Sequence, residues 1–452
     1  MLSALNRHLA QPLWARRGNS QHLRYLKLLE RRQFDSVERV QERQSTAIRE
    51  IVRHAWETVP FYRERWAALG LHPDAVRCSE DLRALPILTK ANIREQGERL
   101  RCDLYRNFNV IRKTTSGSTG VPLTIFVDPD AMAWKRACTI RSDQWSGWRL
   151  GQRVARLWGH GVAERGSWKA RLRRIFFDRE SYLNTLDIDQ ARLKKFADHL
   201  KFNQPGLLFG HAHSLYLFAS YVRTTCPGSV RPKGIVSSAM ILHDWQRGVI
   251  EDAFGTPVTN RYGCEEVSLI ASECEEHHGL HLNADGVYCE VVPDSRTNAG
   301  RLLVTDLRNR AMPLIRYEVG DVVVPTNRVC ACGRGMPMIE SVLGRDADYV
   351  LTPEGSLISG ISLTDHFATE IRGAAQIQLV QEKLTFLRLR LVAGEGFGPD
   401  SHREIESLVR TTFGPRMNYE LELVETIPQE LSGKYRFCIS PVATAYMKSL
   451  AP

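Results

Sequence analysis

Hydrophobic positions early in the chain recur at the spacing of an amphipathic helix. In residues 45–56 the apolar side chains fall at i, i+3, i+4 and i+7, at Ile48, Ile51, Val52 and Ala55. This spacing places them on one helical face. We expect the helix to end before Pro60, since proline disfavours the helical conformation of the residue before it.

The middle of the chain alternates short apolar runs with helical stretches. From about Val110 to Pro325, runs such as Ile235–Val236 and Leu302–Val304 are interspersed with stretches such as Trp245–Phe254. Alternating strands and helices predict layered α/β architecture. We therefore expect a large multi-layer α/β domain over residues 1–343.

The pattern changes beyond Gly344. Gln376–Leu379, Leu387–Leu391 and a segment at Tyr419, Leu421 and Leu423 alternate like half-buried strands. Ser401 and Glu404 suggest a capping box that opens a helix through Ile405, Leu408 and Val409, and Gly414 stops it. We predict a small α+β domain over 344–452, with the boundary near 343–348.

Composition excludes several protein classes. The chain has 452 residues, of which 43% are hydrophobic and 25% charged, so it is not largely disordered. No apolar run reaches the ~18 residues of a membrane helix. No secretory apolar core follows the basic start. We expect a cytoplasmic protein without a transmembrane segment.

The net charge of +10 is concentrated near the start of the chain. Residues 1–33 contain seven Lys or Arg and one acid, and we call residues 1–40 the basic N-terminal arm. A second basic cluster runs from Arg165 to Arg179. Such clusters bind phosphate, nucleic acid or an anionic membrane, or they are simply solvated faces. The solvated face is the commoner case, and nucleic acid is not favoured.

A hydroxyl-rich loop follows the apolar pair Val110–Ile111. It consists of Thr114, Thr115, Ser116, Gly117, Ser118, Thr119 and Gly120. Backbone N–H groups at glycines can approach an anion closely, and the hydroxyls add donors. The loop lacks the Gly-Lys-Ser/Thr ending of a Walker A motif. Taken alone, it is either a phosphate cradle or a plain surface turn.

Three further segments carry polar chemistry. Tyr262, Gly263 and Glu266 form a Tyr-Gly-x-x-Glu motif, in which the ring could stack on a base and the carboxylate could hold Mg²⁺. Asp321 could accept hydrogen bonds from ribose hydroxyls. Lys434 follows a flexible Ser-Gly turn. Each of these signals is weak by itself.

Together and in this order, the motifs resemble the adenylate-forming superfamily. The nearest resemblance is to its phenylacetate–CoA ligase-like branch, which includes CapK-type proteins. The resemblance spans about residues 40–445 and includes His54–Arg63, Leu85–Lys90 and Met312–Asp321. Gly344-Arg345 then corresponds to the hinge before a small mobile C-terminal domain that carries Lys434.

The resemblance implies an AMP-forming ligase with ATP, Mg²⁺ and coenzyme A or an amine as co-reactants. A carboxylic acid would attack the α-phosphate of ATP and release pyrophosphate, and the acyl-adenylate would then pass to coenzyme A or to an amine. Loop 114–120, Ser238, Ala239, Tyr262, Gly263, Asp321 and Arg345 would bind the nucleotide. Glu266 would hold Mg²⁺, and Lys434 would contact the α-phosphate and carboxylate oxygens as the catalytic lysine. Mg²⁺ and an ammonium group supply the charge neutralisation that such a displacement needs.

The chain departs from the superfamily pattern at three positions. Glu265 stands where a hydroxyl residue is usual, so metal binding there could be shared or repulsive. Met240 stands where a glutamate is common. Ala347 and the segment after it lack the usual hinge pattern, which puts thioester formation in doubt.

Four residues suggest a structural zinc site. Cys274 and His281 precede Cys330 and Cys332 by about fifty residues. Three sulfurs and one imidazole can complete a closed tetrahedral zinc shell. His277 and His278 are competing ligands, and reduced, unliganded cysteines are the alternative.

These observations leave three functions. The first is an acid-activating ligase. The second is a degenerate nucleotide-binding protein of the same fold, and the third is a basic protein that binds nucleic acid or another anionic polymer or surface through the N-terminal arm and the Arg165–Arg179 cluster. The sequence leaves open the acid, the acceptor, the oligomeric state, the pathway and the role of the arm.

Overall fold

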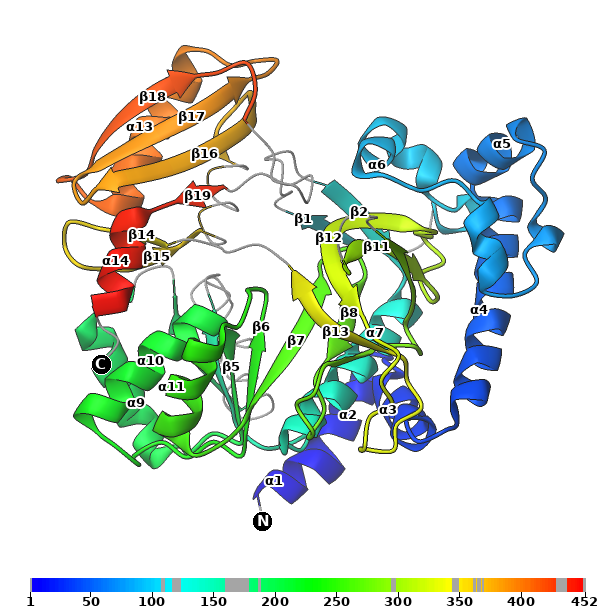
Figure 1. Ribbon diagram of the computed structural model, residues 1–452, viewed down its shortest axis with the longest axis horizontal. Coiled ribbons are helices and arrows are strands. Elements are labelled where there is room, and N and C mark those ends of the chain that lie inside the picture. Colours follow the sequence, from blue (N-terminus) through cyan, green and yellow to red (C-terminus); the bar gives the residue numbers. More distant parts are fainter. Residues whose placement is uncertain are drawn as a thin grey trace. The chain divides into compact units, whose positions relative to one another are not determined.

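The computed structural model describes residues 2–106, 110–115, 123–158, 179–185, 188–293, 298–343, 349–360, 363, 367, 370–427 and 437–449 (Figure 1). The chain packs into two compact units. The first comprises residues 1–114, 123–151 and 259–344, and the second comprises 115–122, 152–258 and 345–452.

The first unit begins with helices. They are α1 (Leu2–Leu5), the π-helical turn η1 (Asn6–Ala10), α2 (Gln11–Arg17), α3 (His22–Arg32), α4 (Val37–Thr58), α5 (Pro60–Ala68), α6 (Lys90–Gln96) and α7 (Pro129–Asp143). Short 3₁₀ turns lie at Pro73–Ala75, Glu80–Ala84, Gly97–Leu100, Asp103–Tyr105 and Gln144–Ser146. Helix α4 begins eight residues before the predicted segment because Ser36 caps it, accepting a hydrogen bond from the Arg39 amide. The four predicted apolar residues are all buried in the main core of this unit.

The first unit also contains antiparallel strands in the order β10-β11-β12-β13-β9-β8-β7. These strands are β7 (Val258–Cys264), β8 (Ser268–Ser272), β9 (Leu280–Leu282), β10 (Val287–Pro293), β11 (Gly300–Asp306), β12 (Tyr317–Pro325) and β13 (Met338–Leu343). A separate two-stranded sheet joins β1 (Ile111–Thr115) and β2 (Leu123–Val127).

The second unit contains a parallel sheet in the order β6-β5-β3-β4. Its elements are β3 (Val154–Trp158), β4 (Glu180–Asn184), α9 (Gln190–Phe202), β5 (Leu207–His211), α10 (Ala212–Thr225), β6 (Gly234–Ser238) and α11 (Asp244–Phe254). Every residue of β5 and β6 is buried, as expected for parallel strands covered on both faces.

The C-terminal part of this unit is a small α+β structure with its own core. Strands β16 (Ala374–Lys383), β17 (Phe386–Ala393), β18 (Asn418–Leu423) and β19 (Cys438–Ile439) pair in the order β18-β17-β16-β19, with α13 (Pro399–Phe413) between β17 and β18. The predicted strands and helix are present. The capping prediction was wrong in register: Gly398 is the N-cap, and Ser401 lies one turn inside and accepts a hydrogen bond from the Gly398 amide.

Two further elements link this small structure to the parallel sheet. They are the hairpin of β14 (Tyr349–Leu351) and β15 (Leu357–Ser359), and α14 (Pro441–Ser449). Tyr349, Leu351 and Ala443 are buried in the core that contains the parallel strands and α9–α11. The predicted α/β fold with a small α+β portion is confirmed, while the division 1–343 and 344–452 stays a prediction. Among the described residues, no helix combines the length and apolarity needed to cross a bilayer.

Candidate functional site

Tyr262 on β7 and Asp321 on β12 meet in the first unit. The Tyr262 hydroxyl donates a hydrogen bond to Asp321 Oδ2 at 2.8 Å. Four strand steps separate β7 from β12 in the sheet order, which would amount to roughly 19 Å in a flat sheet. The sheet therefore curls strongly enough to bring the predicted adenine and ribose residues together.

A second pair connects the same parts of the chain. The Tyr317 hydroxyl, at the start of β12, donates to Glu266 Oε1 at 2.9 Å, just beyond β7. Burial, reinforced by the Glu266 charge, raises the pKa of Tyr317, so its phenol stays protonated and remains a donor. Glu266 is 7% exposed. A buried carboxylate held in one orientation is a suitable oxygen ligand for Mg²⁺.

Close packing explains the glycine between these groups. A Cβ on Gly263 would lie 2.3 Å from the Ser268 backbone oxygen on β8. The register of β7 against β8 shifts between Tyr262 and Gly263. Any side chain at Gly263 would push β8 away and disturb the turn that carries Glu266.

Glu265 is partnered by a lysine that sequence reasoning did not single out. Lys113 on β1 lies with Nζ 3.2 Å from Glu265 Oε2. The Glu265 side chain is 65% exposed, so the two adjacent glutamates point into different environments. Lys113 therefore offsets part of the extra negative charge beside Glu266.

Of the remaining residues predicted to bind the nucleotide, the structure describes four. Thr114 lies exposed near the end of β1, and Thr115 ends that strand. Ser238 ends β6 and Ala239 follows it with φ of 68°, a left-handed conformation that costs an L residue energy. Ser238 and Ala239 belong to the second unit, whereas Tyr262 belongs to the first. That all three contact one nucleotide therefore stays a prediction. Outside the described residues lie Ser116, Gly117, Ser118, Thr119, Gly120, Arg345 and Lys434.

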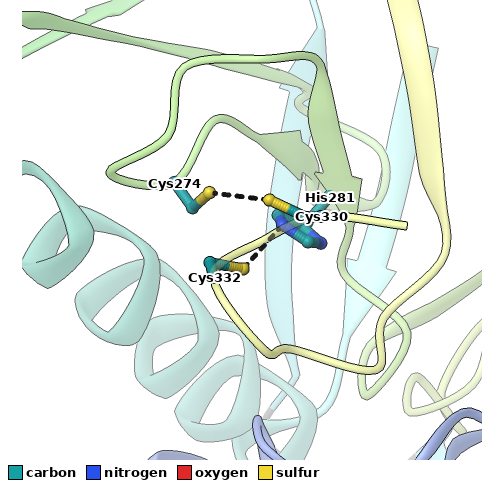
Figure 2. Close-up of side chains that lie close together, drawn as sticks. All are labelled: Cys274, His281, Cys330 and Cys332. Carbon is teal, nitrogen blue, oxygen red and sulfur yellow. Dashed lines mark hydrogen bonds between the residues drawn. The ribbon is translucent and has the colours of Figure 1, made fainter. Parts of the chain in front are cut away.

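The four predicted zinc ligands come together in the first unit (Figure 2). The ligand atoms of Cys274, His281, Cys330 and Cys332 all lie within 4.8 Å of one another. Cys274 Sγ lies 3.6 Å from Cys330 Sγ, and Cys332 Sγ lies 3.3 Å from His281 Nε2. Ligands about 2.3 Å and 2.0 Å from a tetrahedral zinc ion would be separated by roughly 3.5–3.8 Å. The donor set and spacing therefore fit zinc.

Neighbouring groups orient the imidazole. His281 Nδ1 lies 3.3 Å from the Met336 carbonyl oxygen, which accepts a hydrogen bond when Nδ1 carries the proton. This tautomer leaves Nε2 as the ligand atom facing the sulfurs. Burial lowers the pKa of His281 to about 4, so the ring is neutral at pH 7. Trp145 contacts the ring edge-on, with centroids 6.0 Å apart.

The structure also separates His281 from its competitors. His281 lies on β9, which pairs with β13. His277 instead has Nδ1 3.3 Å from a carboxylate oxygen of Glu273, and His278 is exposed. Only His281 of these three joins the sulfur cluster among the described residues.

The chain is similar to known proteins over most of its length. Residues 350–441 match the family model of the CapK C-terminal domain. Protein CapK of Staphylococcus aureus is 26% identical over 374 residues, covering 80% of this chain and 81% of that protein. Phenylacetate-coenzyme A ligase of Pseudomonas putida is 25% identical, covering 72% of this chain and 74% of that protein.

Solved structures extend the likeness to the fold. A 2-hydroxyisobutyryl-CoA ligase in complex with its acyl-adenylate and CoA has a TM-score of 0.59 at 21% identity, covering 93% of this chain and 94% of that one. The same ligase in a postadenylation state gives a TM-score of 0.56 at 20% identity, with the same coverage. The predicted likeness to the adenylate-forming fold and to the phenylacetate–CoA ligase and CapK branch is confirmed.

Proposed function

We propose that this chain, a relative of CapK and of the phenylacetate–coenzyme A ligases with the adenylate-forming fold, activates a carboxylic acid with ATP. The single observation that carries the proposal is the Tyr262–Asp321 hydrogen bond, because it unites two motifs 59 residues apart. The Glu266–Tyr317 pair supports it at the same strands. Each pair uses a residue type suited to a nucleotide or its metal ion.

The proposed reaction has two steps. A carboxylate oxygen attacks the α-phosphorus of ATP, and the bond from that phosphorus to the bridging oxygen of pyrophosphate breaks. The coenzyme A thiol then loses its proton, its sulfur attacks the acyl carbon, and AMP leaves. Mg²⁺, when bound, would neutralise phosphate charge.

The protein groups have separate tasks in this scheme. Glu266 would bind the metal ion, and the hydrogen bond from Tyr317 would fix the orientation of the Glu266 carboxylate. Asp321 would accept hydrogen bonds from the ribose, and Tyr262 would line the base. Lys434 and Arg345 keep their proposed roles at the α-phosphate and the hinge, and loop 114–120 remains the proposed phosphate cradle. Ser238 and Ala239 remain proposed nucleotide contacts.

Coenzyme A is the acceptor we propose, since the relatives named above include coenzyme A ligases. An amine acceptor is the alternative, motivated by the unusual hinge sequence around Ala347. We also propose a structural zinc ion at Cys274, His281, Cys330 and Cys332, where it would tie the Cys330–Cys332 loop to β9. A cytoplasmic location fits ten cysteines that are all free.

The test is ATP–pyrophosphate exchange over a panel of aromatic and short aliphatic carboxylic acids, followed by product analysis with coenzyme A or an amine. Exchange with at least one acid is the expected result. Tight ATP binding without exchange across the panel would instead favour the degenerate nucleotide-binding protein. Thioester without amide would select coenzyme A, and the reverse would select the amine.

A further inference from the structure

The first helical segment of the chain buries two amide side chains and exposes three leucines. This segment runs from α1 through α2, residues 2–17. Asn6, Gln11 and Ala15 are buried, and Gln11 Nε2 donates to Asn6 Oδ1 at 3.2 Å. Leu5 and Leu9 are 54% and 55% exposed, and Leu13 is 61% exposed. Surface helices usually turn their leucines toward the core.

The three leucines form one stripe. Their spacing at i, i+4 and i+8 keeps them on one helical face. The turn at Asn6–Ala10 is π-helical, so it contains about one residue more than an α-helical turn. The buried residues Asn6 and Gln11 are five positions apart and therefore still lie on the same side of the segment. We call Leu5, Leu9 and Leu13 the leucine stripe.

Close contact with a glycine turn fixes the orientation of the segment. A Cβ on Gly151 would lie 2.6 Å from the Ser3 backbone oxygen and 3.1 Å from Arg7 Cβ. Gly151 also has φ of 94°, which an L side chain rarely adopts. The backbone of Ser3–Arg7 is therefore seated directly on this turn, so the leucine stripe faces outward while the helix is docked.

Exposed cations flank the stripe in the sequence. Arg7, Arg16 and Arg17 are exposed on the same helical segment. Helix α3, which packs against α7 and α2, exposes Arg24, Lys27 and Arg31 at i, i+3 and i+7. In the part of the chain that the structure describes, none of these six cations forms an ion pair with a carboxylate.

We propose that residues 2–31 form a docking surface for an anionic lipid bilayer. The leucine stripe would enter the boundary between headgroups and acyl chains, and exposed cations next to it in the segment, Arg16 and Arg17, would meet lipid phosphates. Two other occupants fit less well. A symmetric second copy would bring like-charged surfaces together, and a polynucleotide offers the leucines no apolar partner.

The test is sedimentation of the full chain with vesicles of phosphatidylcholine alone and of phosphatidylcholine with 30% phosphatidylglycerol. The triple variant Leu5→Ser/Leu9→Ser/Leu13→Ser removes the stripe. Its matched control is Leu69→Ser/Leu104→Ser/Leu423→Ser, which changes three leucines of similar exposure elsewhere (58%, 61% and 55%). Arg16→Gln/Arg17→Gln is compared with Lys201→Gln/Lys233→Gln, a pair of exposed cations outside the arm.

We expect the wild type to partition onto anionic vesicles and the stripe variant to lose at least tenfold in partition coefficient. The arginine variant should lose roughly fivefold per charge. Both controls should bind like the wild type, and 0.5 M salt should release the protein.

Several outcomes would overturn the proposal. They are equal binding to neutral and anionic vesicles, unchanged binding of the stripe variant, and equal losses in the controls. Sedimentation equilibrium without vesicles tests whether a second copy of the chain binds this surface. A dimer that dissociates when the leucine stripe is removed would assign the surface to self-association. Salt-sensitive binding to duplex DNA without vesicle binding would assign it to a polynucleotide.

Discussion

The Tyr262 hydroxyl donates to Asp321 Oδ2 at 2.8 Å across a curled antiparallel sheet. This bond joins β7 to β12, which are not neighbours in the strand order. It couples the orientation of an aromatic ring to that of a carboxylate. The proposed function uses both groups on one nucleotide.

Replacing Asp321 by Asn should lower kcat/KM for ATP in pyrophosphate exchange by about 10- to 100-fold, because a charged hydrogen-bond acceptor is lost. Tyr262→Phe should cost less, since the ring remains. In a double-mutant cycle the two losses should be less than additive. Asp74→Asn, an exposed carboxylate of the same unit, is the control. Independent, fully additive losses would argue against a shared role.

The Lys113–Glu265 pair predicts an effect on ATP binding. Lys113→Gln should raise KM for ATP, because the Glu265 charge would then repel phosphate without compensation. The increase should stay below about fivefold, as expected for a partly exposed ion pair. Glu265→Gln should rescue the Lys113→Gln variant. A Lys113→Gln defect that persists in the double variant would mean that the lysine acts on the nucleotide directly.

The sulfur cluster predicts one bound zinc ion per chain. Cys330→Ser/Cys332→Ser protein should lose the metal and melt at least several degrees lower, because a structural metal contributes to folding. Cys78→Ser/Cys226→Ser, which changes two cysteines outside the cluster, should keep both properties. Elemental analysis and thermal melting measure them. Full zinc content in the first variant would reject the ligand set.

Buried His213 predicts a loss of stability in acid. Burial lowers its pKa to about 3, and its ring lies 4.1 Å from that of Tyr349. Between pH 6.5 and 3 the unfolded chain binds a proton there that the folded chain does not. Stability from this group is therefore complete above pH 6.5 and falls as the pH decreases, by at most about 1.4 kcal/mol per pH unit.

Thermal melting between pH 7 and pH 5 measures this effect. His213→Gln should show a shallower decline of the melting temperature than the wild type, whatever its melting temperature at pH 7. His402→Gln, which removes an exposed histidine, should decline like the wild type. A His213→Gln profile parallel to that of the wild type would contradict the assignment.

Local patterns predicted the elements better than their ends or their partners. Ile48, Ile51, Val52 and Ala55 revealed α4, but its start depends on Ser36, whose capping role no periodicity marks. Ser401 has a capping side chain and was assigned to the wrong turn, since Gly398 can also begin a helix. Helix periodicity is set by many residues, whereas a boundary depends on one hydrogen bond.

The residues of the site could be predicted only from the order in which the motifs follow one another along the chain. Tyr262, Glu266 and Asp321 were identified from the resemblance, yet their pairing depends on sheet curvature, which no local spacing encodes. The selection of His281 over His277 and His278 depends on β9 pairing with β13. Lys113 was missed because a lone lysine beside a loop carries no signal until its partner is known.

We propose that Lys434 acts in adenylation, where it would contact the α-phosphate and carboxylate oxygens, and that acyl transfer does not need it. Two assays compare Lys434→Ala with the wild type: acid-dependent ATP–pyrophosphate exchange, and thioester formation from coenzyme A and synthetic acyl-adenylate. Lys383→Ala, an exposed lysine of the same small structure, is the control. We predict that Lys434→Ala loses exchange by at least 100-fold, on the order of one removed transition-state charge contact, while it still forms thioester. Undiminished exchange in the Lys434→Ala variant would rule out this role of the lysine.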